Sequence, residues 1–304
     1  MKSSASTDST DISLVLGSGG ARGLAHIGAI RALEAAGYRI RAIAGSSMGA
    51  LVGGMYAAGK LDKYAEWICS LEQTDVFRLV DWTFSGGGLI RGQRIIKKLE
   101  ELVGDVEIET LPIEFTAVAV DIDAGREIWL ASGSMFEAIR SSIAIPGLFT
   151  PHRYRGRTLV DGGILNPVPV APTMRCLTDL TVVINVNGLP RQAGAETGAG
   201  KDAAGLPDNN GMLGRLRDFI DGFSNNKPPK ETQPGLVAVL IKSLETMEQV
   251  ITRQHLAVFQ PDLIIEVPRD ACMIHEFHRG EELIRLGEEL AGRALSEYAT
   301  PERE

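Results

Sequence analysis

Two short apolar segments, each followed by a glycine-rich turn and a helical pattern, constrain the fold of this 304-residue chain most strongly. Residues 12–16 (ISLVL) and residues 40–44 are typical of buried strands. The first is followed by a helix from about residue 23 to residue 36, which Gly37 ends, and the second by a helix rich in small residues. Two strand–turn–helix units in succession predict a parallel sheet with helices on both faces.

The rest of the chain fits a single α/β domain over residues 1–304. Residues 1–11 are expected to be a flexible N-terminus, and residues 188–235, rich in Gly, Ala, Asn, Asp and Pro, a flexible insertion or a candidate lid. Further strands are expected at 114–120, 127–130, 158–160, 181–186 and 263–267, and further helices at 236–259 and from 277 to about 297. A turn at 123–125 (DAG) suggests that the first two of these strands form a hairpin.

Net charge, cysteine content and apolar stretches limit the partners and the cellular compartment that we expect for this chain. The net charge of −8 and pI near 5.3 argue against nucleic-acid binding and against a purely electrostatic grip on anionic lipid. Cys69, Cys176 and Cys272 form no CxxC pair, which favours a reducing cytoplasm. No apolar stretch reaches 18 residues, and the polar first ten residues lack a signal-peptide core. We therefore expect a cytoplasmic protein that meets membranes only at their surface.

The turn after the second strand carries the first chemical signal. Residues 45–49 (GSSMG) match the pattern GxSxG, with Ser47 in the nucleophile position. Gly45 and Gly49 permit an abrupt turn from strand to helix, where the helix start directs N–H groups towards the reacting centre. Ser46 is out of frame with both glycines and is not expected to react. A glycine turn without chemistry is the weaker interpretation, because strand and helix flank the motif as required.

The turn after the first strand, residues 18–23 (SGGARG), carries the second signal. Stacked N–H groups at a helix start bind negative charge, such as the tetrahedral oxyanion of acyl transfer. A Rossmann fingerprint fails here because the third glycine is misplaced and no acid follows the next strand, and a P-loop fails because its lysine is missing. Arg22 has two interpretations: a residue that stabilises the loop or sits near a phosphate, or a residue that is solvated or forms a structural salt bridge.

The third signal is Asp161, which follows a predicted strand and precedes Gly162 and Gly163. A carboxylate held in such a tight turn can approach a distant Ser47 if the fold brings the two together. Asp and Gly are common in ordinary turns, so this motif gains weight only from the other two.

These motifs, in this order, resemble the patatin-like phospholipase family, and the likeness runs from about Leu14 to Asn187. It includes residues 141–149 (SSIAIPGLF), and the tail with FHR at 277–279 and EELI at 281–284 is similar to the bacterial branch related to the neuropathy target esterase domain. One position departs from the pattern: Ser18 stands where the family usually has the first of three glycines. Serine keeps the backbone N–H at this position, but it does not readily adopt a backbone conformation that favours glycine.

The resemblance implies a three-layer α/β/α fold with a mostly parallel central sheet, and a cofactor-free serine acyl hydrolase acting on phospholipids or lysophospholipids through a Ser–Asp dyad. Ser47 would be the nucleophile and Asp161 the base. The oxyanion donors would be Gly19, Gly20 and Ala21, supported by Gly17, Ser18, Arg22, Gly23, Gly45, Gly49, Gly162 and Gly163.

Alternatives to the dyad and to the substrate class stay open. A Ser–Asp–His triad would draw on one of the five histidines, His26, His152, His255, His275 and His278. Asp121 and Asp123 lack further ligands at metal-binding spacing and are interpreted as turn residues, so no metal is expected. The chain could instead be a general carboxylesterase or a catalytically silent regulatory protein. The expected partners are a lipid or lysolipid, a membrane surface in passing, and a second copy in a homo-oligomer.

Overall fold

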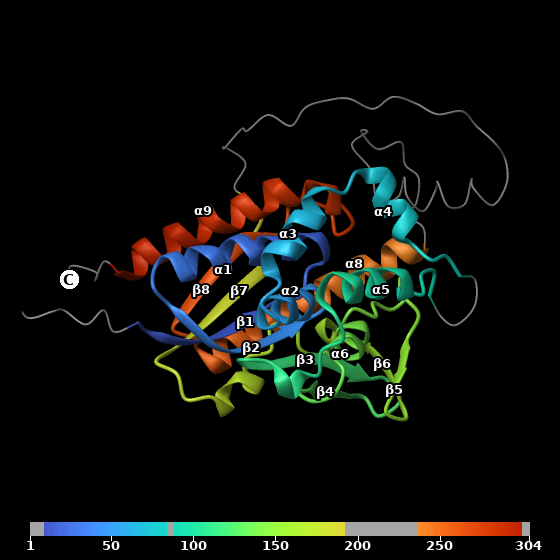
Figure 1. The fold of residues 1–304 in the computed structure, drawn as a ribbon, viewed down its shortest axis with the longest axis horizontal. Coiled ribbons are helices and arrows are strands. Elements are labelled where there is room, and N and C mark those ends of the chain that lie inside the picture. Colours follow the sequence, from blue (N-terminus) through green and yellow to red (C-terminus); the bar gives the residue numbers. More distant parts are fainter. Residues whose placement is uncertain (1–8, 84–87, 192–235, 300–304) are drawn as a thin grey trace, which may run out of the picture.

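The computed structural model describes residues 9–83, 88–191 and 236–299, and these residues form one sheet with helices on both faces (Figure 1). The sheet has the strand order β5-β6-β3-β2-β1-β7-β8, with β4 also paired to β3. Its strands are β1 (Asp11–Leu16), β2 (Arg39–Ser46), β3 (Glu114–Asp121), β4 (Arg126–Leu130), β5 (His152–Tyr154), β6 (Arg157–Asp161), β7 (Leu180–Gly188) and β8 (Leu263–Pro268).

Most strand pairs are parallel, as predicted. β1 pairs in parallel with β2 on one side and β7 on the other, β2 continues to β3, and β7 to β8. The strands β4, β5 and β6 are antiparallel and lie at the β3 side of the sheet. The β3–β4 pair is the hairpin expected around residues 123–125. The three-residue strand β5 was not predicted, because its sequence HRY has no apolar alternation.

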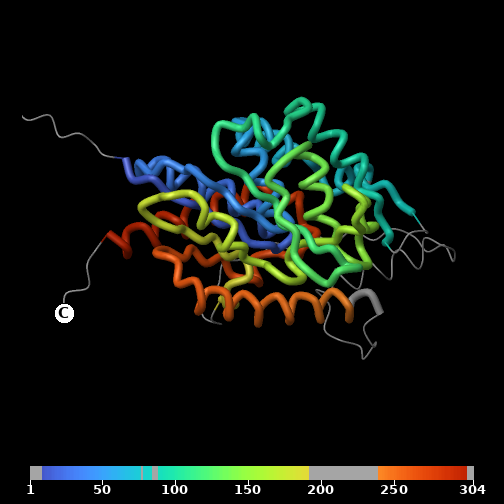
Figure 2. Tube along the Cα trace, turned by 90° about the horizontal axis from the view of Figure 1, so that it is seen from below, coloured from blue at the N-terminus to red at the C-terminus, as the bar shows by residue number. Residues whose placement is uncertain are grey.

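The two faces of the sheet can be followed in β1, where successive side chains point to opposite sides. Ile12, Leu14 and Leu16 join the main core together with helices α1 (Ala25–Ala35), α2 (Met48–Ala57) and α9 (Gly280–Ala299). Val15 joins a smaller cluster with Val183 and the partly buried Leu256 of α8 (Leu236–Phe259), which runs along the opposite side of the molecule (Figure 2, orange). The other helices are α3 (Leu61–Cys69), α4 (Gln73–Leu79), α5 (Gln93–Val103) and α6 (Met135–Ser142).

The ends of β1 and β2 position the two glycine turns beside each other. Leu16 of β1 pairs with Gly45 of β2, so residues 17–20 and the turn at Ser47 leave the sheet at the same edge. The last residue of β6, Asp161, pairs with Ala119 of β3, next to β2. The crevice at the carboxyl ends of parallel strands is where α/β proteins commonly bind ligands.

Two predicted segments fall largely outside the described residues. Of the N-terminus 1–11 the structure describes only residues 9–11, with Asp11 opening β1, and of the insertion 188–235 only residues 188–191. Within the described ranges, no helix has both the length and the apolar character needed to cross a membrane.

Candidate active site

Ser47 lies at the sharp turn between β2 and α2. Its backbone has φ 55° and ψ −121°, a left-handed conformation that residues other than glycine adopt only under strain. The flanking glycines are required by close packing: a Cβ on Gly45 would meet the Gly49 backbone, and a Cβ on Gly49 would meet the Leu16 carbonyl. The turn therefore sits against the end of β1 more closely than a side chain would permit.

The backbone of Ser47 is fixed from two directions. Its N–H donates to the Ser142 hydroxyl at 2.9 Å, and that hydroxyl donates to the Val118 carbonyl at 2.6 Å. Its carbonyl accepts the N–H groups of Ala50 and Leu51 in the first turn of α2. Ser142 belongs to the motif at residues 141–149, but no role was predicted for it. The available signal was a polar residue at the end of a helix that runs into the apolar segment IAIPGLF.

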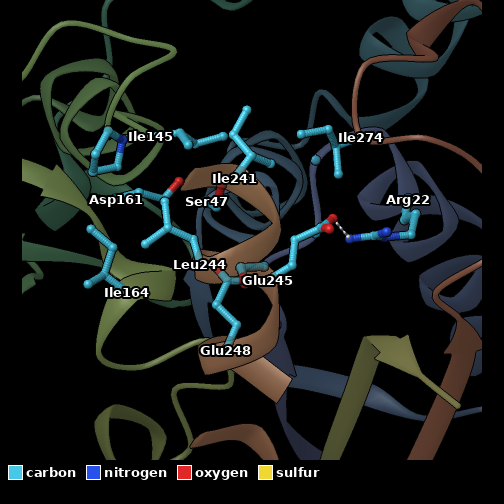
Figure 3. Close-up of a pocket in the computed structure, with 14 residues that line it drawn as sticks. Arg22, Ser47, Ile145, Asp161, Ile164, Ile241, Leu244, Glu245, Glu248 and Ile274 are labelled. Carbon is cyan, nitrogen blue, oxygen red and sulfur yellow. Dashed lines mark hydrogen bonds and ion pairs between the residues drawn. The ribbon is translucent and has the colours of Figure 1, made fainter. Parts of the chain in front are cut away.

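Asp161 is held at the end of β6 by its own turn. Its N–H donates to the Ala144 carbonyl at 3.0 Å, and its Oδ1 accepts the Gly163 N–H at 2.7 Å. The residue is 3% exposed, and its carboxyl group points toward Ser47 (Figure 3). Among the described residues, Oδ2 has no partner with ordinary hydrogen-bond geometry. One carboxylate oxygen is thus committed to the turn and the other is left for the pocket.

Burial raises the pKa of the Asp161 carboxyl from 3.8 to about 7. The Ser47 hydroxyl and the Gly163 N–H both favour the charged form and lower this pKa, but they offset only part of the desolvation. The Ser47 hydroxyl is thus near enough to act on the carboxyl, although it completes no hydrogen bond of ordinary geometry with Oδ2. A carboxyl group with a pKa near neutrality can accept a proton and return it at physiological pH.

The glycine loop offers fewer free donors than the sequence suggested. The N–H groups of Gly17, Ser18 and Ala21 donate to the carbonyls of Ile184, Pro167 and Ile274 at 3.0, 2.9 and 2.9 Å. Ala21 is therefore removed from the expected set of oxyanion donors. For the N–H groups of Gly19 and Gly20, no acceptor is found among the described residues. Both residues line the same pocket as Ser47 and Asp161.

Arg22 ties the glycine loop to the surrounding elements. It is buried, and its guanidinium donates to the Asn187 side chain at 2.9 Å and to the Arg269 carbonyl at 3.0 Å. It also forms an ion pair with Glu245 of α8 at 3.2 Å (Figure 3). These contacts fit a residue that stabilises the glycine loop, and the contact with Glu245 is also a structural ion pair.

The pocket itself is a small cavity of about 40 Å³. Its polar walls come from Ser18, Arg22, Glu245 and Glu248, and its apolar walls from Ile145, Pro146, Ile164, Ile241, Leu244 and Ile274. This volume holds water molecules but not a fatty acyl chain. Four of the lining residues belong to α8 and lie over the site (Figure 3).

Three histidines that could complete a triad, His26, His152 and His255, contact groups other than Asp161. His255 Nδ1 lies 3.1 Å from Asn166 Oδ1, His26 Nε2 lies 2.9 Å from the Gly17 carbonyl, and His152 Nε2 lies 2.8 Å from Glu137 Oε2. Because Oδ1 of Asp161 binds Gly163 and Oδ2 has no partner, no histidine in the described part of the chain is hydrogen-bonded to Asp161.

Asn166 is a second residue that sequence reasoning missed. Its carbonyl accepts the Ser46 hydroxyl at 2.6 Å, and its Nδ2 donates to Glu127 Oε2 at 2.7 Å. Ser46 is fully buried, and its hydroxyl is engaged in this hydrogen bond. Asp121 accepts the Ala124 N–H and pairs with Arg157, as expected of a turn residue.

Comparison with known proteins agrees with the fold and the motifs. A sequence model described as patatin-like phospholipase matches residues 14–174. An uncharacterized NTE family protein of Mycobacterium tuberculosis (strain H37Rv) is 38% identical, covering 96% of this chain and 93% of that protein. Lysophospholipase nte1 of Emericella nidulans is 32% identical over 59% of this chain and 12% of its own length, and neuropathy target esterase sws of Drosophila persimilis is 36% identical over 52% and 11%. The resemblance drawn from the motifs is confirmed, and the chain belongs to the patatin-like phospholipase family.

Proposed function

We propose that this protein is a serine acyl hydrolase that cleaves carboxylic esters of phospholipids or lysophospholipids with a Ser47–Asp161 dyad. One observation carries the proposal: a strained serine and a buried carboxyl with a raised pKa line one pocket with two glycines whose N–H groups have no acceptor among the described residues. These are a nucleophile, a base and an oxyanion site within one small volume.

In the first half of the reaction, Asp161 Oδ2 accepts the Ser47 proton as the serine oxygen attacks the ester carbonyl carbon. The carbonyl oxygen becomes an oxyanion, which the Gly19 and Gly20 N–H groups stabilise in this mechanism. The tetrahedral intermediate then expels the alcohol, which takes the proton from Asp161. The products of this half are the free alcohol and an acyl-enzyme ester on Ser47.

In the second half, water replaces the alcohol. Asp161 accepts a proton from the water as its oxygen attacks the acyl-enzyme, and the same N–H groups hold the second oxyanion. Collapse of this intermediate breaks the bond to Ser47, which recovers its proton from Asp161. The acid is released and the dyad is restored.

The family and the relatives support a lipid ester as the substrate. One relative is named a lysophospholipase and another an esterase. The apolar walls formed by Ile145, Ile241 and Leu244 suit an acyl chain. Because the cavity is too small for such a chain, we propose that α8 shifts when substrate enters from a membrane surface.

Two measurements test the proposal. A fluorophosphonate probe should label the wild type and not Ser47→Ala, and lipid extracts treated with the wild type should gain free fatty acid that Ser47→Ala does not release. Turnover of short-chain esters alone would favour a general carboxylesterase. A wild type that takes no label while a control hydrolase does would contradict the enzyme assignment and favour a silent protein with the same fold.

A further inference from the structure

A second carboxyl group, that of Glu248 on α8, lies in the wall of the same pocket (Figure 3). Its Oε2 accepts the Ser18 hydroxyl at 3.1 Å. Its Oε1 lies against Gly163, since a Cβ on that glycine would be only 2.7 Å from this oxygen. Gly163 also donates its N–H to Asp161, so the two carboxyl groups flank one residue. Glu248 lies outside residues 14–174, the segment that the family model matches.

The contact with Ser18 completes the anchoring of the glycine loop. The Ser18 N–H donates to the Pro167 carbonyl at 2.9 Å, and its carbonyl accepts from Asn187 Nδ2 at 2.9 Å. Its hydroxyl, bound to Glu248, is the third attachment, immediately before Gly19. A glycine at position 18 would keep the two backbone contacts and lose the third. The departure from the family's glycine pattern therefore gives the loop a link to α8.

We propose that Glu248 is a positioning residue of the acyl-transfer site, which holds the glycine loop through Ser18 while its own carboxyl group remains protonated. This inference rests on the proposed function. In the working site Asp161 would carry the single negative charge and Glu248 would be a neutral acid. Ionised Glu248 would add a second negative charge beside the position where the oxyanion forms, and would slow the reaction.

The charged groups around Glu248 favour this order of ionisation. It faces Asp161 at the end of β6, Arg22 on the glycine loop and Glu245 on its own helix. Burial of the Glu248 carboxyl group in the pocket wall and then the Asp161 charge raise its pKa to about 8, against the lowering effects of Ser18 and Arg22. The pKa of Asp161 is about 7. Asp161 also accepts the Gly163 N–H at 2.7 Å, whereas Glu248 accepts the Ser18 hydroxyl at 3.1 Å, so we expect the pair to lose its first proton mainly from Asp161 and its second mainly from Glu248.

The test is the pH dependence of kcat/KM for a lysophospholipid, followed by the release of fatty acid. The kcat/KM of the wild type should rise as pH passes about 7 and fall as pH passes about 8. Glu248→Gln keeps the size and polarity of the side chain without its charge, and should lose the alkaline fall. At pH 9, one unit above the Glu248 pKa, its kcat/KM should exceed that of the wild type by up to about tenfold, the ratio reached when ionised Glu248 blocks the reaction.

Two further variants make the outcome specific. Ser18→Ala removes a hydrogen bond that lowers the Glu248 pKa, so its alkaline fall should move to higher pH. Glu297→Gln, on the exposed end of α9, removes a carboxylate far along the chain from the site and should leave the profile unchanged. An alkaline fall that persists in folded Glu248→Gln would overturn the inference. The inference would also be overturned if the rise in kcat/KM of this variant moved to lower pH. Such a shift would mean that Glu248 in the wild type ionises before Asp161 and raises the Asp161 pKa.

An infrared readout separates this inference from the proposed function. At pH 7 the wild type should show a carbonyl-stretching band of a protonated carboxylic acid that is weaker in Glu248→Gln. Equal bands in the two proteins would overturn the protonated state of Glu248 whatever the activity. Absence of ester hydrolysis by the wild type would overturn the proposed function, and with it the positioning role. If Glu248→Gln does not fold, the alkaline shift of Ser18→Ala decides, and its absence would contradict the proposal.

Discussion

The glycine turns after β1 and β2 and the helix α8 border the same pocket, but they build it in different ways. The turns contribute backbone: the left-handed Ser47, and the N–H groups of Gly19 and Gly20. Helix α8 contributes side chains, and the Ser18–Glu248 contact joins residues 230 positions apart. The conformation of the two turns therefore depends largely on local sequence, whereas the placement of Asp161 and the charge around the pocket depend on the tertiary fold. Changes in the first region should lower the rate, and changes in the second should move its pH dependence.

The largest effect is expected from Asp161→Asn. The amide can keep the contact with the Gly163 N–H and most of the packing, but it cannot accept the Ser47 proton. We expect kcat to fall by about 10⁴–10⁶-fold, the range that single substitutions in a comparable catalytic triad produce. The measurement is lysophospholipid hydrolysis at pH 7.5, with circular dichroism to show that the variant is folded. A loss of less than tenfold would indicate another base, and substitution of His255 would then be the next experiment.

The same variant should be more stable than the wild type at high pH. The folded-state pKa of Asp161, about 7, is above its ordinary value of 3.8, so the native protein holds this proton more tightly than the unfolded chain. Stability therefore falls as pH rises from about 4 to about 7, by about 4 kcal/mol if this group acts alone. Asparagine avoids that loss. Urea unfolding at pH 4 and pH 8 should show a gain for Asp161→Asn only at the higher pH.

Asp121→Asn is a matched control with the opposite sign. The Ala124 N–H, followed by Arg157, holds the pKa of Asp121 below its ordinary value, so ionised Asp121 stabilises the fold above the unfolded pKa. This variant should lose stability at pH 8 and not at low pH. If both variants changed stability in the same direction at pH 8, the assigned burial of the Asp161 charge would be wrong.

Gly20→Ala tests the backbone donors. Gly20 has φ +57°, and an added Cβ would lie 2.6 Å from the Ile274 carbonyl oxygen, so the loop must move. Displacing one oxyanion donor should lower kcat by about 10²–10³-fold. Gly59→Ala is the control, because Gly59 has φ +65° and open space around it. It carries similar strain away from the pocket and should reduce stability with kcat unchanged; equal rate losses in both variants would argue against a donor role for Gly20.

The sequence was sufficient for the parts that depend on local backbone. Glycine spacing and apolar runs predicted β1, β2, the two turns and the parallel sheet, because these patterns act within a few residues. The hydrogen bond from the Ala21 N–H to the Ile274 carbonyl could not be predicted, because Ile274 lies far along the chain from Ala21. The same holds for Ser142, Asn166 and Glu248, whose roles depend on partners that only the tertiary fold supplies.

The smallest expected effect is that of Glu245→Gln, which separates attachment of α8 from its influence on charge. Arg22 is buried but Glu245 is one-third exposed, and Arg22 keeps its contacts with Asn187 and Arg269, so the variant should lose only about 1 kcal/mol of stability. Because the Glu245 charge also raises the pKa of Glu248, the alkaline fall in kcat/KM should move slightly to lower pH. Urea unfolding and the pH profile measure the two effects separately. A large fall in the maximal rate with an unmoved profile would show instead that α8 shapes the reacting geometry itself, and would remove the distinction between the two regions.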